Sequence, residues 1–434
     1  MDTRKTLHIG LSLAPTWLSG AAWRRPDSDV EGIYGPAFAI DVARRAEAAK
    51  LDFVFRPDTL YLNTEMLGTG PGFSSLDPTM LLAAVAGATE AIGLLTTVST
   101  TFWPPYVVAR QLLSLDWISK GRAGWNIVTA LDGHENFGLY AMPSSEARYD
   151  RAAEFTDVVR GLWESFPNQA LVRDRRTGRY ADTTRITPID HEGLHFRVKG
   201  PMSLPSFGTG RIPLFQAGAS EDGRNFAADV ADAIFASTPD KAAAIELRGD
   251  LRRRAERYGR VAGDIRVLPG LSLTLAASRA EAAELFAATH RGADRSRALA
   301  SVKAMTGLDL TGWPSDRRVR PEDLPEAPET VRSRTHADLL RRLIAIETPT
   351  AGDLLTRPEV VGSAHWRIIG TPDDAADEIE DWAAAGAIDG FVALPAGSTT
   401  SMHLFLEEVV PRLTQRGLFR SEYRGTTFAD HLLD

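Results

Sequence analysis

Short apolar runs alternate with helical patterns along most of the chain, and this alternation constrains the fold more than any other feature. The runs are Leu7 to Leu13, Phe53 to Phe55, Ile92 to Val98, Ala123 to Val128, Pro213 to Gln216, Ala233 to Ala236, Ile265 to Leu275 and Gly390 to Leu394. They lack a clear polar alternation, which is typical of strands buried on both faces of a parallel sheet. Strand and helix alternate about eight times, which predicts an α/β fold with one (β/α)8 TIM barrel rather than an open sheet.

Two segments depart from this alternation. Residues from about 167 to 210 contain "RRTGRYAD" and "HEGLHFRVKGP", which are typical of an excursion with a hairpin. Residues from about 280 to 365 begin as a helix and then pass through "WPSDRRVRPEDLPEAPET". We interpret both as insertions in the barrel loops, so that residues 1–434 form a single domain.

Composition narrows the possible functions. The chain has 434 residues and no cysteine, which excludes disulfides, thiolate nucleophiles and cysteine-ligated metals. Its net charge of -8 argues against nucleic acid and anionic membranes as partners. No stretch has the length of a membrane span, and the N-terminal sequence lacks the apolar core of a signal peptide, so we expect a cytoplasmic protein.

One motif resembles a zinc site. "HEGLH", from His191 to His195, matches the zinc-protease pattern, which requires a helix to bring both histidines to one face. Gly193 interrupts the motif, Pro188 precedes it, and polar and apolar residues alternate after it. This pattern indicates a hairpin strand, and we expect no metal site.

A second motif ends a predicted strand in small residues. The run from 213 to 216 is followed by "AGASEDGR", where Gly218 permits close approach of a ligand to the backbone and Ser220 can cap the next helix. The free N–H groups and the dipole of that helix would favour a phosphate. Glu221 and Asp222 would then point away from the ligand. A plain tight turn is the alternative, and the local sequence leaves both open.

Polar residues also end other predicted strands. Asn126 is an amide within the apolar run 123–128, and either the edge of a flavin ring or a structural partner would satisfy it. Asp58 and Thr100 follow two further strands, and a helix is predicted to begin at about Arg148–Tyr149. Because active sites of TIM barrels lie at the carboxyl ends of the strands, these residues share one predicted face.

Several of these segments together resemble one enzyme family. "GRAGWNIVT", "NFGL" and "RYDRAAEF" are similar to the bacterial-luciferase-like flavin monooxygenases, and most closely to the nitrilotriacetate and dibenzothiophene-sulfone monooxygenase branch. "STTFWPPYVVARQLLSLDWISKGRAGWN", "PLFQAGASEDGR" and "HWRIIGTPDDAADEIEDW" also match, in the family's order. The resemblance extends from about residue 5 to residue 412.

The resemblance implies a function and a set of binding residues. It implies a two-component monooxygenase that receives reduced FMN (FMNH2) from a separate NAD(P)H:FMN reductase and inserts one oxygen atom from O2 into a small organic substrate. It also implies a homodimer or homotetramer. By position, Asp58, Thr100 and Asn126 would lie near the isoalloxazine. The phosphate would be held by Tyr149, Ser220 and the backbone of Ala219.

The resemblance assigns no catalytic residue. His134, near a strand end, is a candidate, and a histidine of the barrel rim without a catalytic role is the alternative. Two other functions remain open at this point. One is a deazaflavin-dependent oxidoreductase of the same fold, and the other is a non-catalytic FMN-binding protein.

Overall fold

Eight parallel strands close into a barrel in a computed structural model that describes residues 6–208, 211–290, 295–328, 331, 333–361 and 364–433. In order around the ring, the strands are β1 (His8–Ser12), β2 (Phe53–Arg56), β3 (Gly93–Ser99), β4 (Ala123–Val128), β9 (Leu214–Gln216), β10 (Ala233–Ala236), β11 (Arg266–Leu275) and β13 (Gly390–Pro395). Pairing of β13 with β1 completes the ring. The predicted TIM barrel is therefore confirmed.

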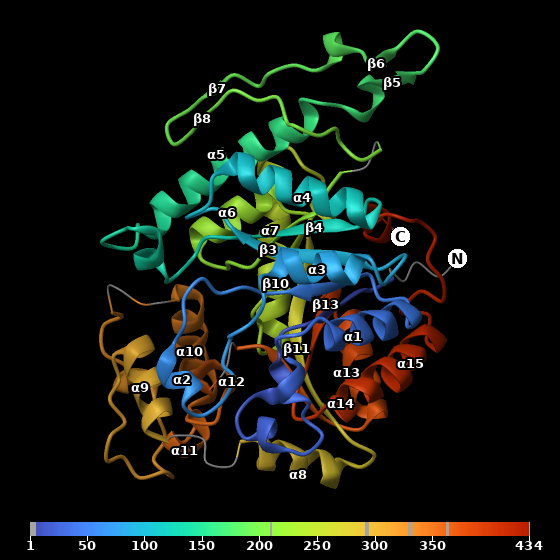
Figure 1. The fold of residues 1–434 in the computed structure, drawn as a ribbon. Helices are drawn as coiled ribbons and strands as arrows, with labels where there is room; N and C mark the ends of the chain where they lie inside the picture. The colour runs from blue at the N-terminus through green and yellow to red at the C-terminus, as the bar shows by residue number, and fades with distance from the viewer. Residues whose placement is uncertain are drawn as a thin grey trace.

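Helices surround this barrel (Figure 1). They are α1 (Ala37–Ala48), α3 (Pro78–Ala86), α4 (Pro105–Ser119), α5 (Ser145–Glu164), α6 (Glu221–Val230), α7 (Lys241–Arg257), α13 (Pro372–Ala384), α14 (Thr399–Leu404) and α15 (Val410–Gln415). The predicted start of α5 was wrong by three residues. Ser144 caps this helix by accepting the N–H of Ala147 at 3.2 Å, so the helix begins before Arg148.

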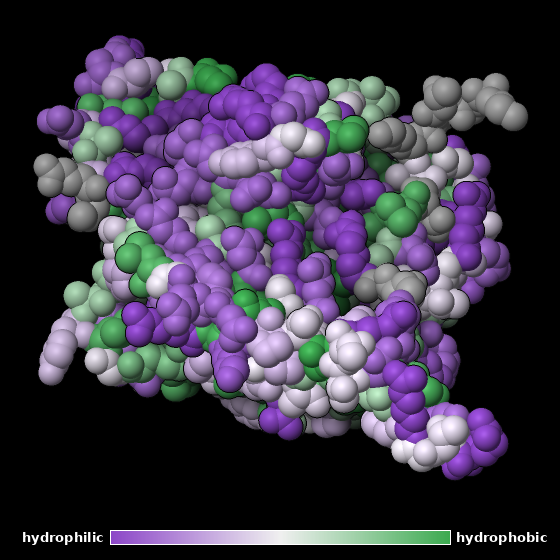
Figure 2. Space-filling model, turned by 90° about the horizontal axis from the view of Figure 1, so that it is seen from above, coloured by the Kyte–Doolittle hydropathy of each residue, from purple (hydrophilic) through white to green (hydrophobic). Residues whose placement is uncertain are grey.

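Two antiparallel hairpins lie between α5 and β9. They are β5 (Leu171–Asp174) with β6 (Arg179–Ala181), and β7 (His191–Glu192) with β8 (Arg197–Val198). The β7–β8 hairpin confirms that "HEGLH" begins in a hairpin strand. Nε2 of His191 lies 2.9 Å from the Glu154 carboxylate. The face turned upward in Figure 1, on the side of the hairpins, is mainly hydrophilic with scattered hydrophobic residues (Figure 2).

A helical segment separates β11 from a ninth strand of the sheet. The segment comprises α8 (Arg279–Thr289), α9 (Arg295–Thr306), α10 (Arg334–Glu347), α11 (Ala351–Leu354) and α12 (Pro358–Val361), and the strand is β12 (Trp366–Gly370). A further short helix, α2 (Thr64–Leu67), follows β2. The eight apolar runs did not include β12, which pairs only with the second half of β11. None of the helices in the described part of the chain combines the length and apolar character needed to cross a bilayer.

The barrel interior is filled by apolar side chains, most of them large. They are Phe53, Phe55, Leu95, Phe215, Ala233, Leu268, Val392 and Leu394. Side chains of a strand alternate between its two faces, so residues between these positions pack outward against the helices. Val54, for example, belongs to the core between barrel and helices. The interior is therefore a packed core, and the carboxyl ends of the strands remain for a site.

The amino-terminal end of the barrel is closed by the C-terminal helix α16 (Phe428–His431). The Phe428 ring is fully buried and lies over two strands where they carry glycine. A Cβ atom would lie 2.6 Å from this ring at Gly93 and 2.4 Å at Gly124. Arg420 anchors the segment, because its Nη2 donates to Asp52 at 2.6 Å and to the carbonyl of His431 at 2.8 Å. We call Phe428 to Leu432 the C-terminal plug.

Candidate functional site

The loop between β9 and α6 presents a helix N-terminus at the carboxyl end of the barrel. Ser220 caps α6, and its hydroxyl accepts the N–H of Gly223 at 3.3 Å, as the sequence predicted. Glu221 is turned toward Arg254, whose guanidinium lies 2.6 Å from its carboxylate. No hydrogen bond from the N–H groups of Ala219 and Ser220 to a described residue is observed. These donors are therefore available to an anion.

Gly218, Tyr149 and Gln216 form a tight cradle beneath this loop. A Cβ atom on Gly218 would lie 2.1 Å from the Tyr149 hydroxyl, so only glycine leaves this space open. Gln216 donates its Nε2 to that hydroxyl at 3.2 Å. Burial raises the pKa of Tyr149, although hydrogen bonds with Thr129, Gln216 and Ser220 oppose this. Tyr149 is therefore a neutral phenol whose hydroxyl can donate a hydrogen bond to an anion.

Two buried amides each leave one oxygen without a partner in the structure. Asn126 donates its Nδ2 to Thr97 at 3.0 Å, and its Oδ1 has no partner. Gln216 is 2% exposed, and its Oε1 also has none. Unsatisfied buried acceptors are costly and are rare unless a ligand completes them. Sequence reasoning singled out Asn126 and missed Gln216, although both show the same signal of an amide within an apolar run.

The other predicted residues lie on neighbouring loops. Thr100 is fully buried and donates through its N–H to the carbonyl of Val128 at 3.0 Å, and through its hydroxyl at 3.4 Å. His134 begins a short 3-10 helix after β4, and its buried Nδ1 has no hydrogen-bond partner among the residues that the structure describes. No contact places His134 against Tyr149 or Ser220 among the described residues. The structure thus brings together Tyr149, Gly218 and Ser220, and places the others around the same end.

At pH 8, an Asp58→Asn variant is expected to be more stable than the parent chain by about 1–3 kcal/mol. Burial raises the pKa of Asp58 from 3.8 to about 6, against an opposing hydrogen bond from Thr59. Between these values the folded chain keeps a proton that the unfolded chain has lost, so stability falls as the pH rises through this window. Asparagine removes the cost of the buried charge at pH 8 and changes little at pH 4.

Urea unfolding at both pH values measures this difference. The exposed Glu31→Gln variant serves as the control, and should unfold like the parent chain at both. An equal gain from Asp58→Asn at pH 4 and pH 8 would contradict the prediction.

A buried imidazole reaches the barrel interior from the insertion. Gly270 follows Leu268 by two positions on β11 and therefore faces inward. The His365 ring occupies the space of the missing side chain, with its Nδ1 2.5 Å from the Cβ position. Burial, with a contribution from His336, lowers the pKa of His365 to about 3. This residue, which sequence reasoning did not single out, is a neutral imidazole that packs beside Phe235, with ring centroids 5.2 Å apart.

The chemistry of these groups fits FMN, the cofactor that the resemblance implies. The free N–H groups and the Tyr149 phenol suit a phosphate, and the unpartnered Asn126 Oδ1 has the chemistry to accept from an N–H such as that of a flavin ring. Among the described residues, no group of three or more histidine or acidic side chains could hold a metal ion.

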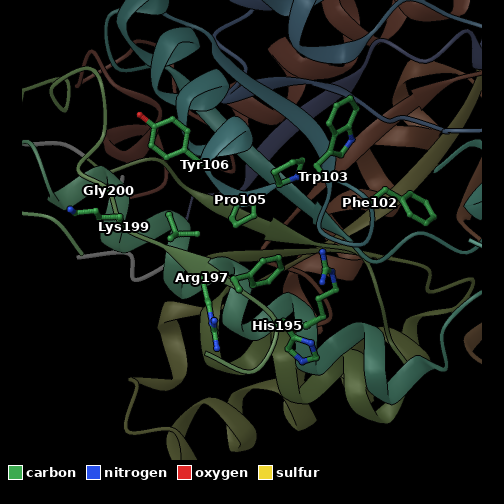
Figure 3. A pocket seen from close by; sticks show the side chains of 12 residues that line it. Phe102, Trp103, Pro105, Tyr106, His195, Arg197, Lys199 and Gly200 are labelled. Carbon is green, nitrogen blue, oxygen red and sulfur yellow. The ribbon is translucent and has the colours of Figure 1, made fainter. Parts of the chain in front are cut away.

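A separate groove of about 540 Å3 lies between the start of α4 and the strand β8 (Figure 3). It is lined by Trp103, Tyr106, Phe196 and neighbouring residues, and none of its lining residues is a predicted site residue. The Arg151 guanidinium lies 4.4 Å from the centre of the Phe196 ring. The groove is therefore distinct from the loop that offers the free N–H groups.

Comparison with known proteins finds relatives that match most or all of the chain. The family model described as luciferase-like monooxygenase matches residues 21–388. The chain is 35% identical to nitrilotriacetate monooxygenase component A of Aminobacter aminovorans, over 100% of this chain and 97% of that protein. It is 32% identical to dibenzothiophene-sulfone monooxygenase of Rhodococcus erythropolis strain XP, over 100% and 97%.

A solved structure shows the same similarity in three dimensions. A crystal structure of riboflavin lyase with modified FMN and the substrate riboflavin is 32% identical and has a TM-score of 0.84, covering 99% of this chain and 96% of that chain. The family model covers most of the chain, and the relatives match it from end to end. The chain therefore belongs to the luciferase-like monooxygenase family and is a flavin-dependent monooxygenase.

Proposed function

We propose that this chain is the oxygenase component of a two-component system that uses reduced FMN and O2 to insert one oxygen atom into a small organic substrate. The observation that carries the proposal is the cradle beneath the β9–α6 loop. There, unused N–H groups, a neutral Tyr149 and a Gly218 without room for a side chain surround one position. The word "component" in the name of the nitrilotriacetate relative supports a separate reductase.

In this proposal the chain binds the flavin, orients it and shields it from water. The bound flavin supplies the chemistry with oxygen. The α6 N-terminus and Tyr149 hold the phosphate. Asn126 bonds the edge of the ring, with Thr100 and Asp58 beside it. The packed barrel beneath excludes water from the reacting atoms.

The further organisation of the protein follows from the same proposal. The whole chain is one barrel domain, with residues 167–210 and 280–365 as insertions. It works in the cytoplasm as a homodimer or homotetramer, and a separate NAD(P)H:FMN reductase supplies its reduced flavin.

A substrate panel tests the reaction. The protein is combined with FMN, NADH, a generic flavin reductase and ¹⁸O2, and offered nitrilotriacetate, dibenzothiophene sulfone and dimethyl sulfide. Relatives of the chain carry the names of these three compounds. At least one product is expected to carry a single ¹⁸O atom by mass spectrometry, and only when FMN is present. Oxygen-independent turnover with a reduced deazaflavin, or tight FMN binding without any product, would contradict the proposal.

An Asn126→Leu variant is expected to bind FMN about 10-fold more weakly, because leucine lacks the unpartnered Oδ1 that would accept a hydrogen bond from the flavin ring. Flavin fluorescence during titration measures the dissociation constant. Asn168→Leu is a matched control, since the Asn168 amide donates to the carbonyl of Ser206 at 3.0 Å, outside the site. Unchanged FMN affinity in Asn126→Leu would show that this amide is structural.

A further inference from the structure

The carbonyl of Ala219 accepts a hydrogen bond from an arginine of α6, the helix that follows the loop. Arg224 donates its Nε to this carbonyl at 3.0 Å. In a trans peptide the C=O and the following N–H point in opposite directions. Fixing the Ala219 carbonyl toward Arg224 therefore aims the N–H of Ser220 to the opposite side, away from the guanidinium.

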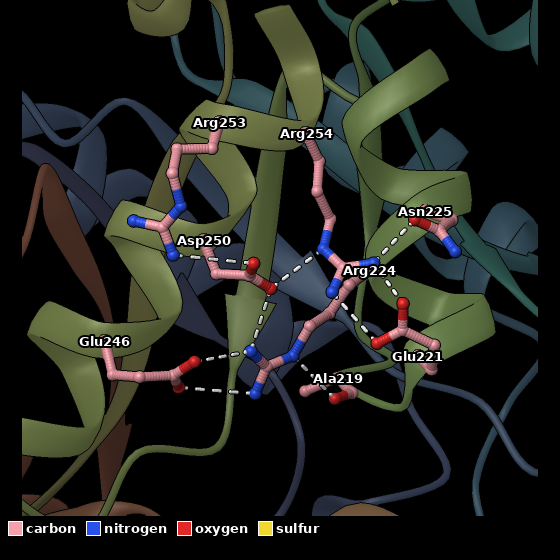
Figure 4. Close-up of polar contacts among 8 residues, drawn as sticks. All are labelled: Ala219, Glu221, Arg224, Asn225, Glu246, Asp250, Arg253 and Arg254. Atoms are coloured by element: carbon pink, nitrogen blue, oxygen red, sulfur yellow. Dashed lines mark hydrogen bonds and ion pairs between the residues drawn. The ribbon is translucent and has the colours of Figure 1, made fainter. Parts of the chain in front are cut away.

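Arg224 is in turn fixed by two carboxylates of α7 (Figure 4). Its Nη1 lies 2.8 Å from Glu246 and 3.0 Å from Asp250. Burial raises the pKa of Asp250, but hydrogen bonds from Arg224 and Arg254 outweigh it and leave the pKa below its usual range. Asp250 is therefore a permanent anion, and the guanidinium of Arg224 cannot rotate away without breaking charged contacts.

The same set of residues turns an acidic side chain away from the loop. Arg254 donates to Asp250 at 2.8 Å and to the Glu221 carboxylate at 2.6 Å. The contact between Arg254 and Asp250 is shielded from water, because their side chains are only 10% and 11% exposed, whereas the Glu221 side chain is 72% exposed. A negative charge in the first turn of α6 is thereby paired with a cation on α7 rather than left facing the loop.

We propose that Arg224 is a positioning residue for the anion site, which it serves by fixing the peptide between Ala219 and Ser220. Glu246 and Asp250 hold Arg224 in the orientation that this task requires. The inference rests on the proposed function, because it assigns the β9–α6 loop to the phosphate of FMN. Arg224 itself does not touch the ligand.

Paired titrations with FMN and riboflavin test this role, because riboflavin lacks the phosphate. An Arg224→Met variant keeps most of the side-chain stem and removes the guanidinium. It is expected to weaken FMN binding about 10-fold and to leave riboflavin binding unchanged. Arg224→Lys, which keeps the charge without the fork of donors, is expected to lie between the two. Arg279→Met is the control, since Arg279 is 82% exposed and pairs with Asp374.

The outcomes separate this inference from the proposed function. If the parent chain binds FMN no better than riboflavin, the phosphate site and the role of Arg224 both fail. If the parent chain prefers FMN but Arg224→Met keeps that preference, only the role of Arg224 fails. An equal loss for both flavins would also overturn it, because general damage to the fold does not distinguish the phosphate. If Arg224→Met does not fold, Arg224→Lys decides by the same comparison.

Discussion

A Gly218→Ala variant is expected to bind FMN about 100-fold more weakly than the parent chain, with nearly the same unfolding temperature. The added methyl group would lie 2.1 Å from the Tyr149 hydroxyl and 2.7 Å from Nε2 of Gln216. The tyrosine is the flexible partner and must move, so its hydroxyl leaves the cradle. Loss of one hydrogen bond from this hydroxyl to a charged phosphate, worth up to about 3 kcal/mol, corresponds to this factor. Isothermal titration with FMN measures it.

A second substitution tests whether Gly218→Ala acts through a clash with the Tyr149 hydroxyl or through general disruption of the loop. In a Tyr149→Phe background the hydroxyl is absent, so Gly218→Ala is expected to cost much less there than in the parent chain. Such non-additivity is the signature of two residues in contact. Equal costs in both backgrounds would show that Gly218 acts through something other than Tyr149.

A Phe428→Ala variant is expected to lose about 3–5 kcal/mol of unfolding free energy, because the truncation leaves a cavity under the barrel. The ring is fully buried and packs on Phe53 and Phe215, with centroids 5.3 Å and 5.7 Å apart. The neighbouring backbone cannot collapse easily into the space, because it belongs to the hydrogen-bonded strands β3 and β4. Urea unfolding followed by tryptophan fluorescence measures the loss.

Leu433→Ala provides the matched control for the C-terminal plug. Leu433 is 75% exposed, although it lies directly after the buried Leu432. Its removal is expected to change the unfolding free energy by less than about 0.5 kcal/mol. A similarly small loss in Phe428→Ala would show that the barrel does not depend on its plug.

The sequence was sufficient to predict the barrel because its strands are buried on both faces and therefore appear as short apolar runs. β12 escaped this reasoning because it carries Arg367 within a short run and joins the ring at one edge only. Tyr149 was named as a site residue, although its helix begins earlier than the pattern indicated. A cap such as Ser144 is hard to choose when other polar residues stand beside it.

The sequence points to candidate site residues where a polar residue interrupts an apolar run or follows the end of a predicted strand. Asn126 shows that signal. Arg224 does not, because its role depends on the Ala219 carbonyl and on two acids more than twenty positions further along the chain. Nothing local distinguishes it from a solvent-facing arginine. Likewise, the place of His365 beside Gly270 arises from two segments that meet only in the folded barrel.

The C-terminal plug also determines when the barrel core can finish folding during synthesis. All eight ring strands are synthesised before Phe428 to Leu432. Until the plug is in place, the aromatic rings of Phe53 and Phe215 are exposed at the amino-terminal end of the barrel. The barrel core is therefore completed only after this segment has been made, and a product truncated before Phe428 is expected to aggregate more readily than the parent chain.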